Sequence, residues 1–279
     1  MIDSLPNALP FFILLGLAGA WIVWLLGKPW FTRQRRARLR RQPFPPEWRT
    51  ILKARVPYIR SLPADLQIQL KGHVQVFLAE KAFIGCRGLV VTDEMRVTIA
   101  AQACLLLLNR TTDYFPGLRQ ILVYPGPFIV NRVHTDSAGV RQDQRQVLAG
   151  ESWSEGQVIV SWEDVVEGAA DASDGHNVVI HEFAHQLDQE NGVANGAPIL
   201  APHHATRWAQ VMSQAYVELQ QQTDAQQPSL INDYGATDPA EFFAVVSETF
   251  FEQAHRLALE HPDLYREMVG FYAVDPLSW

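Results

Sequence analysis

The stretch "NVVIHEFAHQLDQENG", residues 177–192, is the most informative part of the chain, because it places His-Glu-x-x-His inside an apolar, helix-like pattern. His181 and His185 are four residues apart, so on a helix their imidazoles share one face and can bind one ion. Glu182 projects beside that face and can reach a water in the open position of the ion. Apolar residues between the histidines supply a buried face, and Gly192 ends the helix. The pattern predicts a catalytic metal helix of the metalloprotease type.

A third metal ligand is expected downstream, in "INDYGATDPAEFFAVVSETFFE", residues 231–252, because two histidines hold zinc poorly. Glu241 lies in the first turn of a predicted helix that Asp238 or Thr237 would cap. A glutamate at that position can also complete a capping box without any metal. Glu248 follows two turns later on the same face and can be a ligand, a partner of a ligand or a surface residue. Spacing alone does not choose between the two glutamates.

Two further features near the motif have open interpretations. Asp188, three residues after His185, either accepts a hydrogen bond from a ligand histidine or is a solvated residue at the helix end. The stretch "GQVIVSWEDV", residues 156–165, predicts a strand that runs into a helix capped by Ser161. This strand is either the sheet edge that pairs with a substrate backbone or an internal core strand.

The N-terminus predicts a membrane anchor at about residues 8–27, because residues 4–27, "SLPNALPFFILLGLAGAWIVWLLG", carry no charge. As a helix, these 24 residues span about 36 Å, enough to cross the hydrocarbon core of a bilayer. Trp21, Trp24 and Trp30 suit a membrane interface. A cleaved signal peptide is disfavoured because "MIDS" contains no basic residue, and a buried core helix is the other alternative.

Charge and cysteine content indicate the compartment. The stretch 32–41 holds six arginines, which predict a single-pass protein of the bacterial inner membrane with its C-terminal domain in the cytoplasm. Two cysteines, Cys86 and Cys104, form no metal or disulfide pattern and also indicate a reducing compartment. The net charge is −7 and residues 1–50 carry +6, so the remainder carries −13. That balance argues against nucleic-acid binding and leaves the arginines for anionic lipid.

The proline-rich "QPFPPEW", residues 42–48, separates the anchor and its basic flank, 1–41, from one domain at 42–279. Periodicity and capping signals predict helices at 47–61, 64–82, 92–109, 176–189, 203–222, 238–254 and 262–272. Apolar runs between turn signals predict strands at 120–125, 127–133, 145–152 and 156–162. Strands before the motif and helices after it predict an α+β domain, a small mixed sheet packed on helices. The histidines outside the motif are interpreted as structural or surface residues: His73, His134, His176, His203, His204, His255 and His261.

The motifs "HEFAHQLDQENG" and "DYGATDPAEFFAVVSETFFE" resemble the Mlc titration factor A family of bacterial zinc peptidases. The similarity extends through "FPPEWRTIL", "TDEMRVTIAAQACLLLLNR" and "GESWSEGQVIVSWEDV", and covers nearly everything after residue 42. Family members are similar to the catalytic domain of anthrax lethal factor, in which a tyrosine precedes the zinc-binding glutamate by seven residues. Tyr234 and Glu241 match that spacing.

The resemblance implies a zincin-like metallopeptidase domain with one Zn²⁺ per chain. It implies that Glu241 is the third ligand beside His181 and His185, and that Tyr234 stabilises the oxyanion while Glu182 acts as general base. It also implies aminopeptidase activity on short peptides and binding to the glucose-responsive repressor Mlc. The charge-free N-terminal segment departs from the best-known members, which are soluble.

Two functions therefore compete, and a third is weaker. The leading one is a membrane-tethered zinc peptidase acting on peptides or proteins, either as an exopeptidase or as an endopeptidase. The second is a binding protein that sequesters a regulator and whose zinc is structural or vestigial. The presence of Glu182, and three candidate ligands where structural zinc usually has four, favour the enzyme. The third, a nucleic-acid binder using the arginines, conflicts with the acidic main domain.

Overall fold

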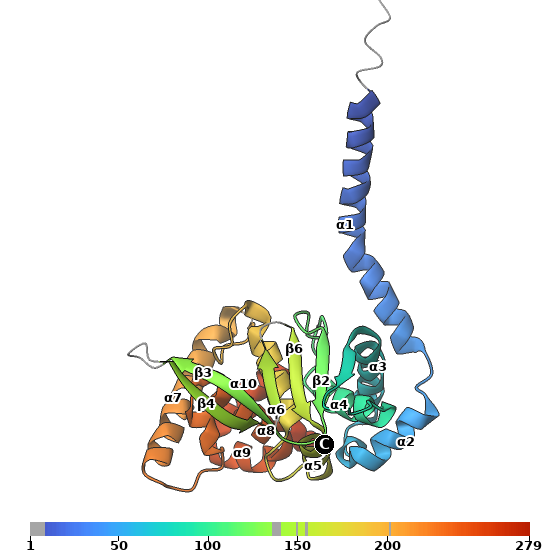
Figure 1. Cartoon of the computed structure of the whole chain (residues 1–279). Helices are drawn as coiled ribbons and strands as arrows, with labels where there is room; N and C mark the ends of the chain where they lie inside the picture. Colours follow the sequence, from blue (N-terminus) through green and yellow to red (C-terminus); the bar gives the residue numbers. More distant parts are fainter. Residues whose placement is uncertain (1–8, 136–140, 149, 154–155, 201) are drawn as a thin grey trace, which may run out of the picture. The chain divides into compact units, whose positions relative to one another are not determined.

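The computed structural model describes residues 9–135, 141–148, 150–153, 156–200 and 202–279 (Figure 1). The chain divides into two compact units, Met1–Pro43 and Phe44–Trp279, and each is described by itself. The boundary lies inside the proline-rich stretch 42–48, because proline there removes the backbone donors that a continuing helix needs.

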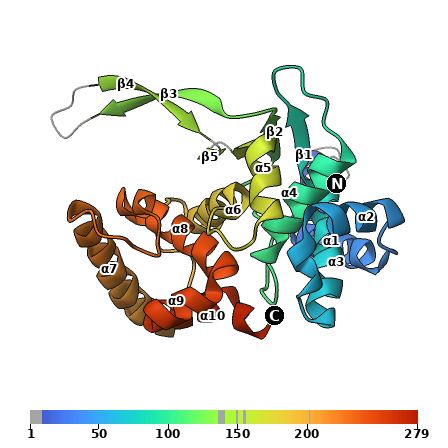
Figure 2. The same cartoon turned by 90° about the horizontal axis from the view of Figure 1, so that it is seen from below.

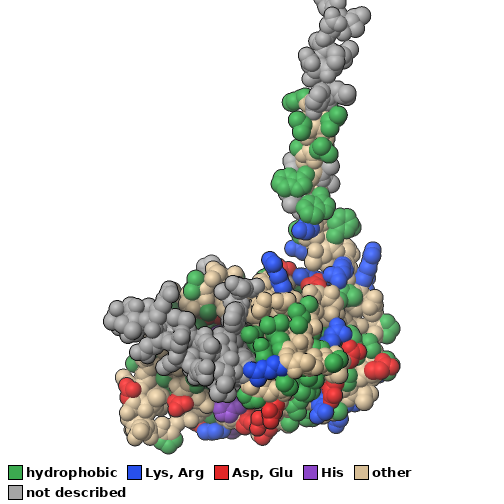
Figure 3. Space-filling view, viewed as in Figure 1, with side chains coloured by type: hydrophobic (Ala, Val, Ile, Leu, Met, Phe, Trp, Pro, Cys, Tyr) green, Lys and Arg blue, Asp and Glu red, His purple; other side chains and the backbone are tan. Residues whose placement is uncertain are grey.

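The described part of the first unit is one helix, α1 (Leu9–Arg41), with Pro29 inside it. Large apolar side chains on this helix are exposed, as the green atoms in Figure 3 show: Phe11, Phe12, Ile13, Leu14, Leu15, Leu17, Trp21, Trp24, Trp30 and Phe31. No helix in the described part of the chain is both long enough and apolar enough to cross a membrane. The anchor expected at 8–27 is therefore not supported, and its residues before Leu9 lie outside the described part of the chain.

The second unit contains a four-stranded mixed sheet with the order β1-β2-β6-β5. The strands β1 (Ala82–Gly85), β2 (Gln120–Tyr124) and β6 (Gln157–Ser161) are parallel, and β5 (Gly150–Trp153) is antiparallel to β6. A separate antiparallel hairpin joins β3 (Phe128–Thr135) to β4 (Arg141–Leu148) and extends away from the sheet in Figure 2. The expected α+β class with a small mixed sheet is confirmed.

Helices supply most of the second unit. They are α2 (Pro46–Arg55), α3 (Ala64–Glu80), α4 (Asp93–Leu105), α5 (Trp162–Ala170), α6 (Val178–Asp188), α7 (Pro202–Asp224), α8 (Pro239–Glu252), α9 (Ala254–Glu260) and α10 (Pro262–Tyr272). Short 3-10 turns lie at Pro57–Arg60, Gln189–Asn191, Asp233–Ala236 and Pro276–Ser278. The metal helix α6 lies between the strand β5 and the helix α8, as Figure 2 shows.

An aromatic cluster fixes the buried face of α6. Phe183 is fully buried, and its ring centroid lies 5.6 Å from that of Phe77 on α3 and 4.9 Å from that of Phe115. Aromatic pairs at these separations are favourable beyond their buried area. The opposite face of α6, which carries the histidines, is thereby turned toward α8.

The boundary between β4 and β5 corrects the expected strand 145–152. One apolar run was interpreted as one strand, whereas the structure has two strands with different partners: β4 pairs with β3, and β5 pairs with β6. The strand 157–161 is consequently internal, with β2 on one side and β5 on the other. The interpretation of 156–165 as the substrate-pairing edge is wrong. The strands with one neighbour in the described sheet are β1 and β5, and β5 is the one beside β6.

One helix ends earlier than the sequence predicts, because a proline restricts the backbone. The helix expected at 47–61 ends at Arg55, because Val56 precedes Pro57 and adopts an extended φ of −130°. Thr92 caps α4 as expected, accepting a hydrogen bond from the Met95 backbone N–H at 3.4 Å. Strand β1 and helix α9 were not predicted, since each is short and carries no strong start or stop signal.

Candidate metal centre

The helix α6 begins at a capping residue that links it to its neighbours. The Asn177 side chain accepts a hydrogen bond from the Ile180 backbone N–H at 3.0 Å. Its amide group also donates to the Gln102 side chain at 2.8 Å and to the Gly168 carbonyl at 3.2 Å. The position of the first turn of α6 is therefore fixed by α4 and α5, and His181 follows in the next turn.

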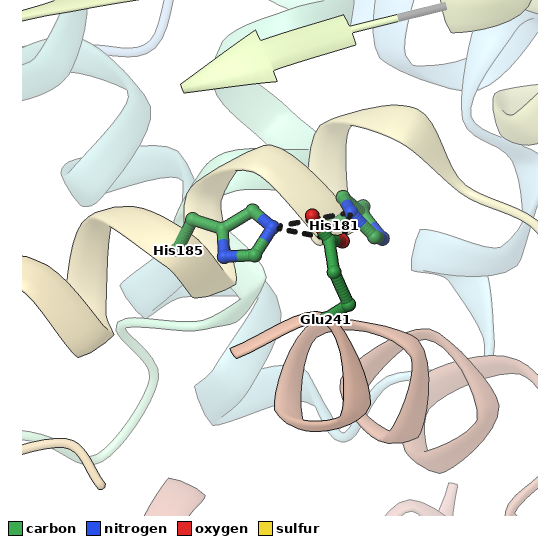
Figure 4. Close-up of side chains that lie close together, drawn as sticks. All are labelled: His181, His185 and Glu241. Atoms are coloured by element: carbon green, nitrogen blue, oxygen red, sulfur yellow. Dashed lines mark hydrogen bonds and ion pairs between the residues drawn. The ribbon is translucent and has the colours of Figure 1, made fainter. Parts of the chain in front are cut away.

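The helix α8 brings Glu241 to the two histidines. Asp238 caps α8 by accepting hydrogen bonds from the Ala240 and Glu241 backbone N–H groups at 2.8 and 3.0 Å. The Glu241 carboxylate is turned to α6 rather than to its own helix end. Its Oε2 lies 3.0 Å from His181 Nε2 and 3.3 Å from His185 Nε2 (Figure 4). The structure thus places Glu241 with the histidines and not in a capping box.

The three ligand atoms fit one tetrahedral metal ion. His181 Nε2 and His185 Nε2 are 3.2 Å apart, so all three separations lie between 3.0 and 3.3 Å. Ligands about 2.0–2.1 Å from a tetrahedral ion would be roughly 3.3 Å from one another. Among the described residues, this is the one His/Cys/Asp/Glu group that converges closely enough to hold an ion. Its donor set suits a divalent metal.

Electrostatics in the cluster favour the ligating form of Glu241. Burial alone would raise the pKa of Glu241, but hydrogen bonds and charge from His181 and His185 outweigh it and lower the pKa far below the usual range. Burial acts to lower the pKa of His181, and hydrogen bonds to Glu241 and Glu248 reverse that effect and raise it well above its usual value. A metal ion at this position would take the place of the Nε2 proton, because histidine binds a metal in its neutral form.

Glu248 lies behind His181 and orients it. Its Oε1 is 2.8 Å from His181 Nδ1, and its Oε2 accepts a hydrogen bond from the Asn177 backbone N–H at 2.6 Å. With Nδ1–H donating to Glu248, the lone pair of His181 Nε2 faces Glu241 and His185. Of the interpretations left open for Glu248, the structure favours the outer partner of a ligand.

Asp188 is fully buried, so it is not a solvated residue at the helix end. Its Oδ2 accepts hydrogen bonds from the Asn195 and Gly196 backbone N–H groups, each at 2.7 Å. Among the described residues, no hydrogen bond joins Asp188 to His181 or His185. Burial raises the pKa of Asp188, and the backbone donors oppose that rise. Its role is to hold the loop after α6.

Glu182 and Tyr234 line the same cleft as His181, a cavity of about 430 Å³. The Glu182 side chain is 4% exposed, and Tyr234 is 38% exposed. The Tyr234 and His181 ring centroids are 6.0 Å apart. Tyr234 belongs to the 3-10 turn Asp233–Ala236, which packs against the first turns of α8. The seven-residue spacing between Tyr234 and Glu241 therefore places the phenol beside the metal ligands.

Sequence reasoning missed three groups around the cleft. Asp174 and His176 line it from the loop before α6, although His176 was interpreted only as a structural or surface residue. Glu252, four residues after Glu248, accepts hydrogen bonds from the Asn177 side chain at 3.0 Å and the Gly175 backbone N–H at 3.1 Å. Glu248 and Glu252 are four residues apart, so they lie on one face of a helix, and this spacing could have indicated that both face α6. Of the other histidines, His73 is buried and lies 2.9 Å from the Tyr114 hydroxyl.

We expect Glu252 to make stability fall as pH rises. Burial, followed by the charges of Asp174 and Glu248, raises its pKa from 4.5 to about 8. The folded state therefore binds more protons than the unfolded state between these values, and stability is lost as pH rises through that window. Replacing Glu252 by Gln removes this titration. The quantity to measure by urea denaturation is the free energy of unfolding of Glu252→Gln minus that of wild type. This difference should be more favourable to the variant at pH 9 than at pH 5, by an amount on the order of 2–4 kcal/mol.

The matched control for this measurement is Glu218→Gln, because Glu218 is exposed on α7. The same urea denaturation series is measured for it over the same pH range. A pH-independent difference for Glu252→Gln would contradict the burial effect on Glu252.

The fold and the site together define the class of protein, a metallopeptidase-like domain with two histidines from one helix and a glutamate from another. Comparison with known proteins gives the particular family. The model of the family described as glucose-regulated metallo-peptidase M90 matches residues 30–273. The chain belongs to this family.

Relatives include an uncharacterized protein of Synechocystis sp., 40% identical over 275 residues, 98% of each chain. The Mlc titration factor A of Escherichia fergusonii is 34% identical over 235 residues, 83% of this chain and 87% of that one. The Mlc titration factor A of Klebsiella pneumoniae is 35% identical over 226 residues, 80% of this chain and 84% of that one. The expected resemblance is confirmed.

Proposed function

We propose that this protein is a zinc-dependent peptidase with aminopeptidase-like action on short peptides. The observation that carries the proposal is that the ligand atoms of His181, His185 and Glu241 lie within 3.3 Å of one another. His181 and Glu182 line the same cleft. When bound, zinc would polarise the scissile carbonyl and lower the pKa of a water molecule toward about 7.

The chain's own residues supply the remaining steps. Glu182 lies beside the ligands and can accept the proton of the attacking water, then pass it to the leaving amine. The Tyr234 hydroxyl can donate a hydrogen bond to the carbonyl oxygen as that oxygen gains negative charge. Glu248 holds His181 with its Nε2 lone pair directed to the metal position.

The test is zinc content and peptide hydrolysis, measured together on the full-length chain. A panel of aminoacyl-nitroanilides and N-acetylated peptides separates aminopeptidase from endopeptidase action. The proposal expects about one zinc per chain, loss of hydrolysis on chelation and its return with zinc. A fully metallated protein that hydrolyses no substrate in the panel would contradict it.

We expect Tyr234→Phe to reduce turnover by about 10²–10³-fold, because the change removes one hydrogen-bond donor to the oxyanion. KM and zinc content should change little, since the phenyl ring can keep the position of the phenol. Steady-state kinetics with the best nitroanilide substrate measures the effect. The control is Tyr216→Phe, because the Tyr216 hydroxyl donates to the Ala236 carbonyl at 3.2 Å outside the cleft lining. An unchanged turnover in Tyr234→Phe would remove Tyr234 from the mechanism.

A second candidate function is sequestration of a transcriptional repressor, and the name Mlc titration factor A of two relatives favours it. In this case the metal is structural or vestigial, and the chain acts by binding an Mlc-like repressor. Copurification of such a repressor with both wild type and Glu182→Gln supports binding that is independent of hydrolysis. No direct binding to nucleic acid is proposed.

Attachment to the bacterial inner membrane, with the main domain in the cytoplasm, is also a proposal. Its support is the exposed apolar side chains in the first half of α1 and the arginines that follow in the same helix. Fractionation of cells that produce the full-length chain, with a reporter active only in the periplasm at its C-terminus, tests both parts. Recovery in the soluble fraction contradicts attachment, and strong reporter activity contradicts the orientation.

A further inference from the structure

His176 lies in the loop between α5 and α6 and lines the cleft. It borders the cavity of about 430 Å³ together with Glu182 and Tyr234. His176 is exposed, although its neighbours in the chain, Gly175 and Asn177, are buried. Among the residues that the structure describes, its imidazole forms no hydrogen bond, ion pair or aromatic contact. Both ring nitrogens are therefore accessible to a molecule in the cleft.

Carboxylates of α8 hold the backbone on both sides of His176. The Gly175 N–H group donates a hydrogen bond to Glu252 Oε2 at 3.1 Å. The Asn177 N–H group donates to Glu248 Oε2 at 2.6 Å. The helix α8 also carries the third candidate metal ligand, so these two hydrogen bonds fix the backbone of His176 relative to the candidate metal centre.

The loop conformation at His176 is also fixed locally. Gly175 has a φ of +84°, in the left-handed region that glycine adopts without strain. A Cβ atom at Gly175 would lie 3.2 Å from Gln253 Nε2, so the loop packs closely there. The His176 N–H group donates to Asp174 Oδ1 at 2.8 Å. The imidazole therefore extends from a rigid backbone, and binding of a ligand would order the side chain alone.

The cleft contains many hydrogen-bond acceptors and few side-chain donors. The Asn177 amide already donates to neighbours behind α6, and both ring nitrogens of His181 face carboxylates. Apart from the Tyr234 hydroxyl, the side-chain donor that can turn to a ligand is the His176 imidazole, among the described lining residues. The acceptors are the carboxylates that line the cleft: Asp164, Glu167, Asp174, Glu182 and Glu248.

A peptide in this cleft needs donors for its carbonyl oxygens. Each residue of a peptide brings one carbonyl acceptor and, except for proline, one N–H donor. The carboxylates can accept the N–H groups, but a carbonyl that leaves water without a new donor is unfavourable. In the proposed mechanism, the Tyr234 hydroxyl donates to the scissile carbonyl. A second carbonyl in the cleft therefore requires a different donor.

We propose that His176 is a substrate-binding residue, and that its imidazole N–H group donates a hydrogen bond to a backbone carbonyl of the peptide other than the scissile one. The inference rests on the proposed peptidase function and adds a substrate class, peptides with at least one carbonyl beyond the scissile bond. Single aminoacyl derivatives lack that carbonyl. His176 thus favours longer peptides over such derivatives.

Equilibrium binding to the full-length, zinc-loaded Glu182→Gln protein tests this contact without hydrolysis. The two probes carry one alanine or three alanines before the same fluorescein-labelled linker, and fluorescence anisotropy gives their dissociation constants. The readout is the ratio of the two affinities. We expect His176→Leu to lower this ratio about tenfold, because one carbonyl of the longer probe loses its donor. An unchanged ratio in His176→Leu would overturn the proposal.

Two matched variants show whether the N–H group is responsible. His176→Gln keeps an N–H donor and should restore most of the ratio. His255→Leu should leave the ratio unchanged, because His255 is exposed on α9 and does not line the cavity. Equal losses in His176→Gln and His176→Leu would overturn the assignment of His176 as a donor. Circular dichroism and zinc content confirm that each variant is folded and metallated.

Hydrolysis by the metallated wild type separates this proposal from the peptidase proposal. If the ratio falls as expected but the wild type hydrolyses no peptide, the contact with His176 is supported and the peptidase proposal fails. If the wild type hydrolyses peptides but the ratio is unchanged in His176→Leu, the peptidase proposal holds and the inference about His176 fails.

Discussion

Replacing Glu182 by glutamine is expected to slow peptide hydrolysis by at least about 10²–10⁴-fold while leaving zinc content and fold unchanged. The residue lies beside the ligand His181 in the sequence and lines the cleft, but it is not among the three residues whose ligand atoms converge. Glutamine keeps the shape of the side chain and cannot accept the proton of a water molecule. The loss should be larger if the same group also protonates the leaving amine.

The measurement compares hydrolysis of the nitroanilide panel by wild type and Glu182→Gln at equal zinc content. The matched control is Glu163→Gln, an exposed acid that does not line the cleft, which should retain full activity. Equal hydrolysis by wild type and Glu182→Gln would refute the peptidase mechanism and shift support to sequestration.

Removing any one of the three ligands is expected to abolish stable zinc binding. His181→Ala, His185→Ala and Glu241→Ala each leave two protein ligands, too few for a stable zinc site. Glu248→Ala should still bind most of its zinc at saturating metal, with affinity about 10–100-fold weaker, because it removes only the hydrogen bond that orients His181.

Zinc content after dialysis, and competition with a chromogenic chelator, measure these differences. The control is Glu252→Gln, because Glu252 contacts the Asn177 cap and no ligand directly. If Glu241→Ala retained zinc while Glu248→Ala lost it, Glu248 would be the third ligand, and Glu241 would be a capping residue.

The sequence predicted the parts of the site that depend on local spacing. His181 and His185 are one turn apart on a helix, so their shared face follows from helix geometry alone. The choice between Glu241 and Glu248 did not follow, because both lie on the face of α8 that meets α6. Only the crossing of the two helices brings Glu241 Oε2 to Nε2 of His181 and Glu248 Oε1 to Nδ1 of the same ring.

Long-range contacts explain the remaining differences. Asp188 was ambiguous because its partners, the backbone N–H groups of Asn195 and Gly196, belong to a loop whose path has no periodic signal. The places of Asp174 and His176 in the cleft lining were not foreseen for the same reason, since the loop before α6 brings them there. The order of the strands could not be predicted from the sequence either. The composition of the strand at 157–161 fits an edge strand or a central strand, and its pairing with β5 makes it central.

The position of β5 has a consequence for which conformations of a substrate can react. This strand has one neighbour in the described sheet and contacts the metal helix α6. A sheet edge offers unpaired backbone groups in a regular row, and only a chain segment whose own backbone groups are unpaired can match them. Helices and the interiors of folded domains cannot do so. Unfolded ends, linkers and damaged chains can, so the physical state of a polypeptide, as much as its sequence, would decide its susceptibility.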